Sequence, residues 1–125
     1  MIEFHILMKT TLDSIVRPKI RVQTLLIGAS RGSEAVLECQ VEGSPRPGTS
    51  WMRSDEESSL TGPRYHMTEQ VSGSNMVIMR LKISDVNEKD FGAYKCSGKN
   101  TLGDKEGYIR LFGENFLFHL LIITN

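Results

Sequence analysis

The sequence lacks an excess of charge of either sign. Its 15 lysines and arginines are balanced by 15 aspartates and glutamates, so the formal net charge of the 125 residues is zero at neutral pH. Proteins that attract nucleic acid or an anionic membrane surface usually carry a basic surplus. We therefore expect neither a nucleic-acid partner nor electrostatic binding to a membrane.

Long apolar runs and targeting signals are also missing. Glu3, Lys9 and Asp13 interrupt the apolar residues at the N-terminus, so no signal-peptide core forms there. The most apolar stretch, residues 116–123, is far shorter than the roughly 20 residues that a transmembrane helix needs. We expect no signal peptide and no transmembrane segment in this chain. Any membrane attachment would belong to missing parts of a longer parent protein.

Catalytic and metal-binding signatures are absent as well. His5, His66 and His119 have no ligand spacing with one another or with the cysteines. Residues 55–57 (Asp-Glu-Glu) lack the alternating oxygen ligands of a calcium loop. Residues 90–92 spell the metal-binding triplet of protein kinases, but the other kinase motifs are missing. We therefore expect no enzymatic activity, no metal or other cofactor, and no small-molecule substrate.

Cysteine is scarce, and its two copies form a single candidate pair, Cys39 and Cys96. A disulfide between them would close a long loop and stabilise the fold by roughly 4 kcal/mol. One pair favours an oxidising compartment, although less strongly than a dense disulfide framework would. Two reduced, buried thiols are the alternative.

Residues 90–96 (Asp-Phe-Gly-Ala-Tyr-Lys-Cys) are the most informative stretch that the sequence does contain. Side chains alternate along a β-strand, so Tyr94 and Cys96 face one side while Ala93 and Lys95 face the other. A tyrosine two residues before a cysteine is typical of a tyrosine corner, in which the hydroxyl bonds to backbone groups upstream. This stretch therefore predicts a strand with a buried tyrosine and a buried cysteine.

A second cysteine and the single tryptophan complete a larger pattern. The order Cys39, Trp51, Cys96, with Tyr94 in place, is that of an immunoglobulin sandwich. We therefore predict an all-β fold, an immunoglobulin-like β-sandwich of two antiparallel sheets with Greek-key connections. The expected structural core residues are Trp51, Leu81, Asp90, Gly92 and Tyr94.

Alternating apolar and polar residues predict the other strands. Turn signals such as residues 43–48 (Gly-Ser-Pro-Arg-Pro-Gly) separate them. No stretch has the length and periodicity of an amphipathic helix. The expected strands cover residues 19–27, 35–42, 49–53, 65–71, 76–84 and 105–112, in addition to the tyrosine strand.

Several motifs together resemble an intermediate-set (I-set) immunoglobulin domain. They are Gly32 upstream of Cys39, residues 81–83 (Leu-Lys-Ile), the tyrosine strand, and residues 99–104 (Lys-Asn-Thr-Leu-Gly-Asp). More narrowly, residues 37–45 and 99–111 resemble the third domain of lachesin-like neural adhesion proteins. That group includes insect neuronal receptors that pair with Dpr-type partners and the vertebrate IgLON proteins.

The resemblance implies an extracellular protein-recognition or cell-adhesion module at the cell surface. The chain would be a fragment of a neuronal receptor of the lachesin type, in which a third domain acts as a spacer or in contacts on the same membrane. Its partners would be other cell-surface proteins of the immunoglobulin superfamily. The alternative is an intracellular structural I-set module of the muscle type, which works with reduced cysteines.

The resemblance stops at both tails, which sets the expected domain boundaries. We expect the immunoglobulin-like domain to cover residues 18–112. Residues 1–17 would be an N-terminal extension outside the domain, and residues 113–125 an apolar C-terminal tail.

Two further expectations concern side chains. Arg64, at the start of an edge strand, is placed to meet Asp90 at the corner before the tyrosine strand. The sheet that contains Trp51 should turn other side chains outward, and these form a candidate protein contact because Tyr, Arg and Met are favoured in interfaces. The alternative is that they are ordinary exposed residues. The candidate contact residues are Met52, Lys95, Tyr108 and Arg110, with Ala93 among them.

Overall fold

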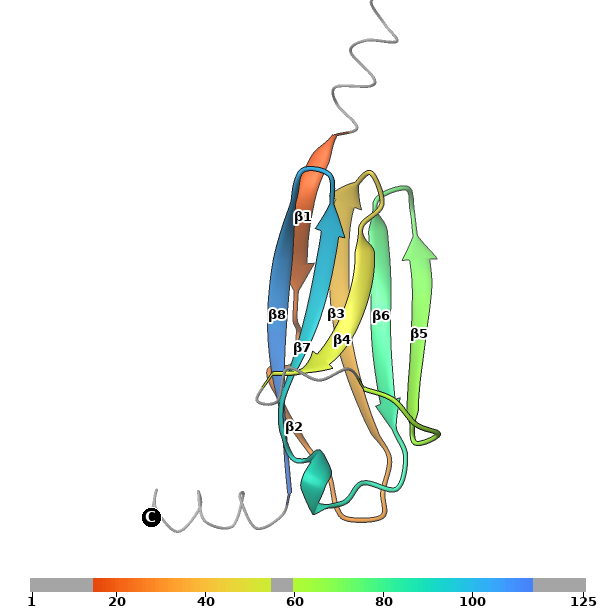
Figure 1. The fold of residues 1–125 in the computed structure, drawn as a ribbon, viewed down its shortest axis with the longest axis vertical. Coiled ribbons are helices and arrows are strands. Elements are labelled where there is room, and N and C mark those ends of the chain that lie inside the picture. The colour runs from red at the N-terminus through yellow and green to blue at the C-terminus, as the bar shows by residue number, and fades with distance from the viewer. Residues whose placement is uncertain (1–14, 55–59, 114–125) are drawn as a thin grey trace, which may run out of the picture.

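Among the residues that the structure describes, eight strands form two facing sheets, and one short 3-10 helix lies outside them (Figure 1). The computed structural model describes residues 15–54 and 60–113, and the account below is limited to them. The elements in chain order are β1 (Val16–Arg21), β2 (Leu26–Gly28), β3 (Ala35–Ser44), β4 (Gly48–Arg53), β5 (Tyr65–Ser72), β6 (Met76–Ile83), η1 (Glu88–Asp90), β7 (Gly92–Asn100) and β8 (Gly103–Phe112).

The predicted immunoglobulin-like sandwich is confirmed. The first sheet has the strand order β1-β3-β6-β5 and is antiparallel throughout. The second sheet has the order β2-β8-β7-β4. One pair in it departs from the expected antiparallel arrangement, because β2 runs parallel to β8.

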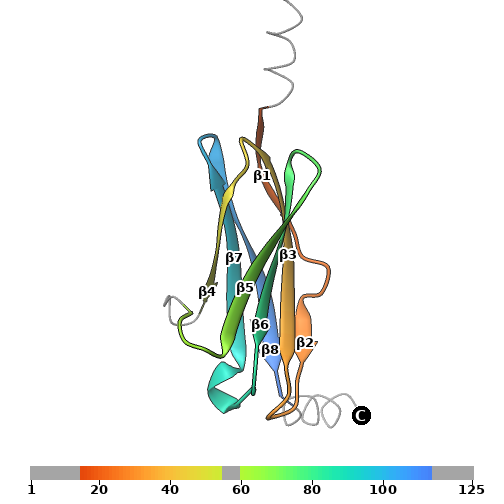
Figure 2. The ribbon, with the colours of Figure 1, turned by 90° about the vertical axis from the view of Figure 1, so that its right-hand side faces the viewer.

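The N-terminal strand differs from the single irregular strand expected over residues 19–27. The chain leaves the first sheet after β1, crosses the edge of the sandwich, and joins the second sheet as β2 (Figure 2). Exposed polar residues, Gln23 and Thr24, occupy the crossing. β1 also begins at Val16, upstream of the boundary expected at residue 18, and its register shifts around Pro18, which has no N–H to donate to the ladder.

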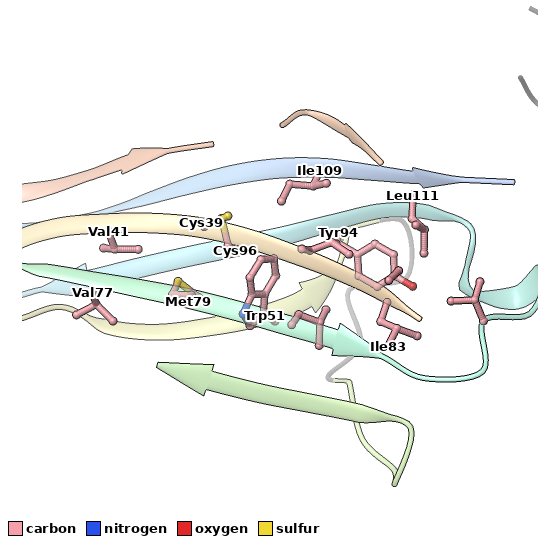
Figure 3. Packing of buried hydrophobic residues seen from close by; sticks show 14 residues of the cluster. Cys39, Val41, Trp51, Val77, Met79, Ile83, Tyr94, Cys96, Ile109 and Leu111 are labelled. Atoms are coloured by element: carbon pink, nitrogen blue, oxygen red, sulfur yellow. A yellow bond between two sulfur atoms is a disulfide. The ribbon is translucent and has the colours of Figure 1, made fainter. Parts of the chain in front are cut away.

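The core lies between the sheets and follows from alternation along the long strands. Inward residues of β3 and β6 are direct cross-strand partners, for example Leu37 with Leu81. The second sheet contributes a ring from each of β4 and β7 and two aliphatic side chains from β8 (Figure 3). The buried apolar residues are Ala35, Leu37, Cys39, Val41, Trp51, Val77, Met79, Leu81, Ile83, Val86, Tyr94, Cys96, Ile109 and Leu111.

A disulfide joins the two sheets at the centre of this core. Cys39 of β3 and Cys96 of β7 are bonded with an S–S distance of 2.04 Å and a Cα–Cα distance of 6.6 Å. Trp51 is the cross-strand partner of Cys96 and lies beside the bridge, with only 4% of its surface exposed (Figure 3). The bridge and the indole ring therefore hold the middle of the second sheet against the first.

Candidate protein-contact face

The outer face of the second sheet presents its side chains in cross-strand rows. Met52 on β4 is opposite Lys95 on β7, which is in turn opposite Tyr108 on β8. The next row places Arg110 on β8 between its partners on β7 and β2, Ala93 and Leu26. The structure thus brings the predicted contact residues onto one continuous surface, which we call the outer face.

Accessibility across the outer face is uneven. Tyr108 and Leu26 are 50% and 56% exposed, and Arg110 is also exposed. Met52 is half-buried, and only 18% of the Lys95 side chain is accessible. Lys95 is therefore better explained as a side chain held within the surface than as a free cation.

A small hydrogen-bonded network fixes the centre of the outer face. Glu106 on β8 accepts a hydrogen bond of 2.7 Å from the Tyr108 hydroxyl and lies 3.6 Å from the Lys95 ammonium group. The bond from Tyr108, with the nearby Lys95 charge, lowers the pKa of Glu106, and the same bond raises the pKa of Tyr108. The network limits the rotamers of the Tyr108 ring. Glu106 was not among the predicted contact residues, although its position two residues before Tyr108 on the same strand places it on the same face.

The outer face has a polar end and an apolar end. At the polar end the hydroxyls of Ser50 and Ser97 are 2.6 Å apart. At the other end the small Ala93 lies in the row between β4 and β8, beside Arg110. No carboxylate in the described ranges, 15–54 and 60–113, forms an ion pair with Arg110. The apolar end therefore combines hydrophobic side chains with a cation that can meet an acidic group on a partner.

An ion pair with a buried carboxylate stabilises the corner from which β7 starts. Asp90 is 1% exposed and accepts hydrogen bonds of 2.7 and 2.9 Å from Arg64, so the expected contact between them is confirmed. Tyr65 Oη and the Asn87 backbone N–H each donate a further bond of 2.9 Å. Burial alone would raise the pKa of Asp90, but the bonds from Arg64, Asn87 and Tyr65 outweigh it and lower the pKa.

The tyrosine corner has the predicted geometry. The Tyr94 hydroxyl donates a 2.5 Å hydrogen bond to the Asp90 backbone carbonyl, and burial of the phenol raises its pKa. Gly92 begins β7 with a φ of 147°, a conformation that side chains disfavour. The turn into β7 therefore depends on the residue type at each of these positions.

Arg53 is a buried cation that the sequence analysis did not predict. It is 6% exposed and donates bonds of 2.7 and 3.2 Å to the backbone carbonyls of Lys89 and Phe91. Its guanidinium carbon lies 4.9 Å from the centroid of the Tyr94 ring. Period-2 alternation from Trp51 would have placed Arg53 inward, since the two residues share one face of β4.

The described residues contain neither a metal-binding cluster nor a membrane-spanning helix. No group of three or more His, Cys, Asp or Glu side chains there is arranged to hold a metal ion. None of the helices formed by these residues has the length and apolarity to cross a membrane.

The family follows from a comparison with known protein families. A family model described as an immunoglobulin domain matches residues 17–100. This chain belongs to the immunoglobulin domain family. The match includes both cysteines, the tryptophan and the tyrosine corner described above.

Curated relatives of this immunoglobulin domain are much longer proteins. Protein amalgam of Drosophila melanogaster is 35% identical over 97 residues, which are 77% of this chain and 28% of amalgam. Protein sax-3 of Caenorhabditis elegans is 37% identical over 66% of this chain and 6% of its own length. Neural cell adhesion molecule L1 of Takifugu rubripes is 36% identical over 60% of this chain and 5% of L1. The chain thus spans between about one twentieth and less than a third of these relatives.

Solved structures support the same fold. A chain in the crystal structure of Dpr2 Ig1-Ig2 in complex with DIP-Theta Ig1-Ig3 is similar with a TM-score of 0.73 and 38% identity. That match covers 79% of this immunoglobulin domain's chain and 33% of the other. Titin domain M3 gives a TM-score of 0.65 and 26% identity, with 79% of this chain and 98% of the titin chain covered.

Proposed function

We propose that this immunoglobulin domain is an extracellular recognition module of a neuronal cell-surface protein and that it contacts other proteins through its outer face. The observation that carries the proposal is the row at the apolar end of that face, where the exposed Arg110 on β8 lies between Ala93 and Leu26, next to the row of Tyr108, Lys95 and Met52. Tyrosine and arginine dominate the binding energy of many protein interfaces, and methionine adapts to irregular partners. The partner would be another cell-surface protein, of the immunoglobulin superfamily, with an acidic group opposite Arg110.

The names of the relatives support this proposal. Neural cell adhesion molecule L1 is a named adhesion molecule, and the Dpr2 and DIP-Theta chains were crystallised as a complex. The chain spans only a small share of each relative. This fits a domain within a longer receptor of the lachesin type, where it would act as a spacer or in contacts on the same membrane. Residues 18–112 would be the functional unit of that parent, extended to Val16 by β1.

The second candidate function is an intracellular structural module of the muscle type. The titin neighbours favour it, since titin M3 has the same fold over almost its whole length at 26% identity. The two candidates differ in the redox state of their cysteines. Non-reducing mass mapping of the endogenous protein separates them, because a Cys39–Cys96 bridge supports the extracellular function and two free thiols contradict it.

Binding measurements test the outer face directly. The chain, produced in a secretory host, is measured against a panel of immunoglobulin-superfamily ectodomains. We expect Arg110→Glu and Tyr108→Ala each to weaken binding at least tenfold, or about 1.4 kcal/mol. The control is Arg21→Glu on β1, an exposed residue of the other sheet, which should change the Kd less than twofold. Equal effects of Arg21→Glu and Arg110→Glu would show that net charge, and not this face, controls binding.

A further inference from the structure

A second surface lies between β4 and β5. It is at the edge of the second sheet farthest from β2. These two strands are the edge strands of opposite sheets. A hollow of about 410 Å³ lies between them, lined by Thr49, Ser50 and Trp51 of β4, by residues of β5, and by Met79 of β6. We call this hollow the edge groove, and none of the residues proposed for the outer contact face lines it.

The wall of the edge groove on β5 is made of side chains that point inward but remain accessible. Met67 and Val71 pair with the core residues Leu81 and Val77 of β6, so they share the inner side of the first sheet. They are nevertheless 46% and 47% exposed. The second sheet ends at β4, and within the described residues no strand covers β5 from the inside. Of these two, Met67 lines the groove, so it presents there an apolar side chain that the fold itself does not cover, with Glu69 next to it on the same face of β5.

The tryptophan in the groove holds an unpartnered donor. Trp51 is 4% exposed, and its Nε1–H has no hydrogen-bond partner in the described part of the chain. Figure 3 shows the indole nitrogen on the side of the ring toward Met79, which also lines the groove. Buried tryptophan N–H groups normally find an acceptor. An oxygen atom entering the groove next to Met79 would supply one.

The charge of the groove and its backbone groups indicate which kind of ligand it can bind. Glu69 is the one charged residue among those lining it, and one oxygen of its carboxylate accepts a bond from the Thr49 hydroxyl. Ser54 donates its backbone N–H to Ala93 on β7. Since these bonds alternate along an antiparallel ladder, the backbone groups of Thr49 and Trp51 point away from β7, along the groove.

We propose that the edge groove binds an extended segment of a partner polypeptide in which an apolar side chain neighbours a lysine or arginine. The segment pairs with the outer edge of β4 at Thr49 and Trp51, as in β-strand addition. Its apolar side chain lies against Met67 and Met79, and a main-chain oxygen accepts from Trp51 Nε1. Its cation pairs with Glu69. The groove shares Ser50 with the polar end of the outer face, but Met52, Lys95, Tyr108 and Arg110 do not line it, so failure of this site would leave the proposed function untouched.

The single tryptophan provides a direct assay, since one indole N–H signal reports on the groove. The full chain labelled with ¹⁵N is titrated with a blocked hexapeptide, Thr-Leu-Lys-Leu-Lys-Thr, and with its acidic counterpart, Thr-Leu-Glu-Leu-Glu-Thr. We expect the basic peptide to shift the indole signal and the Thr49 amide signal saturably, and the acidic peptide to bind at least tenfold more weakly. Glu69→Gln, which retains an acceptor for Thr49, should weaken binding of the basic peptide at least threefold and reduce its salt dependence.

A matched control and two contrary outcomes complete the test. Glu42→Gln removes an exposed carboxylate from β3, outside the groove, and should leave the affinity unchanged. The proposal is wrong if neither peptide moves the indole signal, or if both peptides move it equally. It is also wrong if dilution of the chain alone shifts the indole and Thr49 signals, because a second copy of the chain would then occupy the groove.

Discussion

Arg64 and Asp90 form a bidentate ion pair, in which the two terminal guanidinium nitrogens donate to different carboxylate oxygens at 2.7 and 2.9 Å. The pair is asymmetric, because 32% of the Arg64 side chain is accessible and only 1% of Asp90. Arg64 therefore remains solvated when its partner is removed, whereas Asp90 would be left as a buried charge. We therefore expect Arg64→Ala to reduce the free energy of unfolding more than Asp90→Ala does.

A double-mutant cycle tests the pair. Arg64→Ala should destabilise the fold by roughly 3 kcal/mol, because it leaves the buried carboxylate of Asp90 with fewer donors. The coupling energy between Arg64→Ala and Asp90→Ala should exceed about 1 kcal/mol in urea denaturation. The control is the exposed pair of Arg31 and Glu88, whose side chains are 64% and 67% accessible and whose coupling should be below about 1 kcal/mol. Additive effects of Arg64→Ala and Asp90→Ala would contradict the prediction.

The same carboxylate predicts how stability depends on pH. The pKa of Asp90 is lower in the folded state, so its contribution is fully present above the unfolded value of about 3.9. That contribution is lost as the pH falls through the lower, folded value. Free energies of unfolding measured from pH 6 to pH 2 should fall less steeply for Asp90→Asn than for the parent chain. The control is Asp104→Asn, at an exposed position, which should keep the slope of the parent chain. If Asp90→Asn also keeps that slope, Asp90 is not the source of the pH dependence.

The tyrosine corner can be tested by removing one oxygen atom. Tyr94→Phe leaves the Asp90 backbone carbonyl without its buried donor and should cost roughly 1 to 3 kcal/mol. Tyr108→Phe removes a hydroxyl that bonds Glu106 on the surface, and should leave the denaturant midpoint nearly unchanged. Denaturant midpoints at constant m-value test both expectations. Similar midpoints for the two variants would mean that the corner bond adds no stability.

The strands and the core could be predicted because each long strand alternates cleanly and has one face covered. β3 and β6 illustrate this, since each inward residue of one, such as Leu37, meets an inward residue of the other. Alternation gives no such information on β5, where Met67 points inward and is still exposed. Its accessibility depends on the width of the opposite sheet, which is a property of the whole fold.

Three other features were missed for different physical reasons. The crossing between β1 and β2 depends on which sheet has an available edge, and local preferences along residues 19–27 do not specify that. Arg53 was overlooked because a charged residue is rarely buried unless its bonds are satisfied. Its acceptors are the backbone carbonyls of Lys89 and Phe91, far away in the sequence. On the outer face, alternation identified the positions but not the contact between Glu106 and Lys95.

The domain boundaries remain a prediction, and truncation tests them. A chain of residues 15–113 should melt within about 2 °C of the full chain and be more soluble, since residues 116–123 have the composition of an aggregation-prone segment. Starting at residue 18 instead removes the pairing of Val16 with Ser44 and the 3.0 Å bond from Asn100 to the Val16 carbonyl. A loss of about 1 kcal/mol would lower the melting temperature by roughly 4–8 °C. Equal melting of the two truncated chains would place the boundary at residue 18 after all.

The crossing of the N-terminal strand also determines how the domain responds to a pulling force. The chain enters at β1 and leaves after β8 at opposite ends of the sandwich, so tension between these points acts along the strands (Figure 1). Because β2 runs parallel to β8, this tension shears their hydrogen bonds together instead of opening them one at a time. The Cys39–Cys96 bridge then sets a limit to extension, since the intervening chain cannot lengthen while the bridge is intact. One crossover at the edge of the sandwich thus places the β2–β8 ladder under shear when the two ends of the domain are pulled apart.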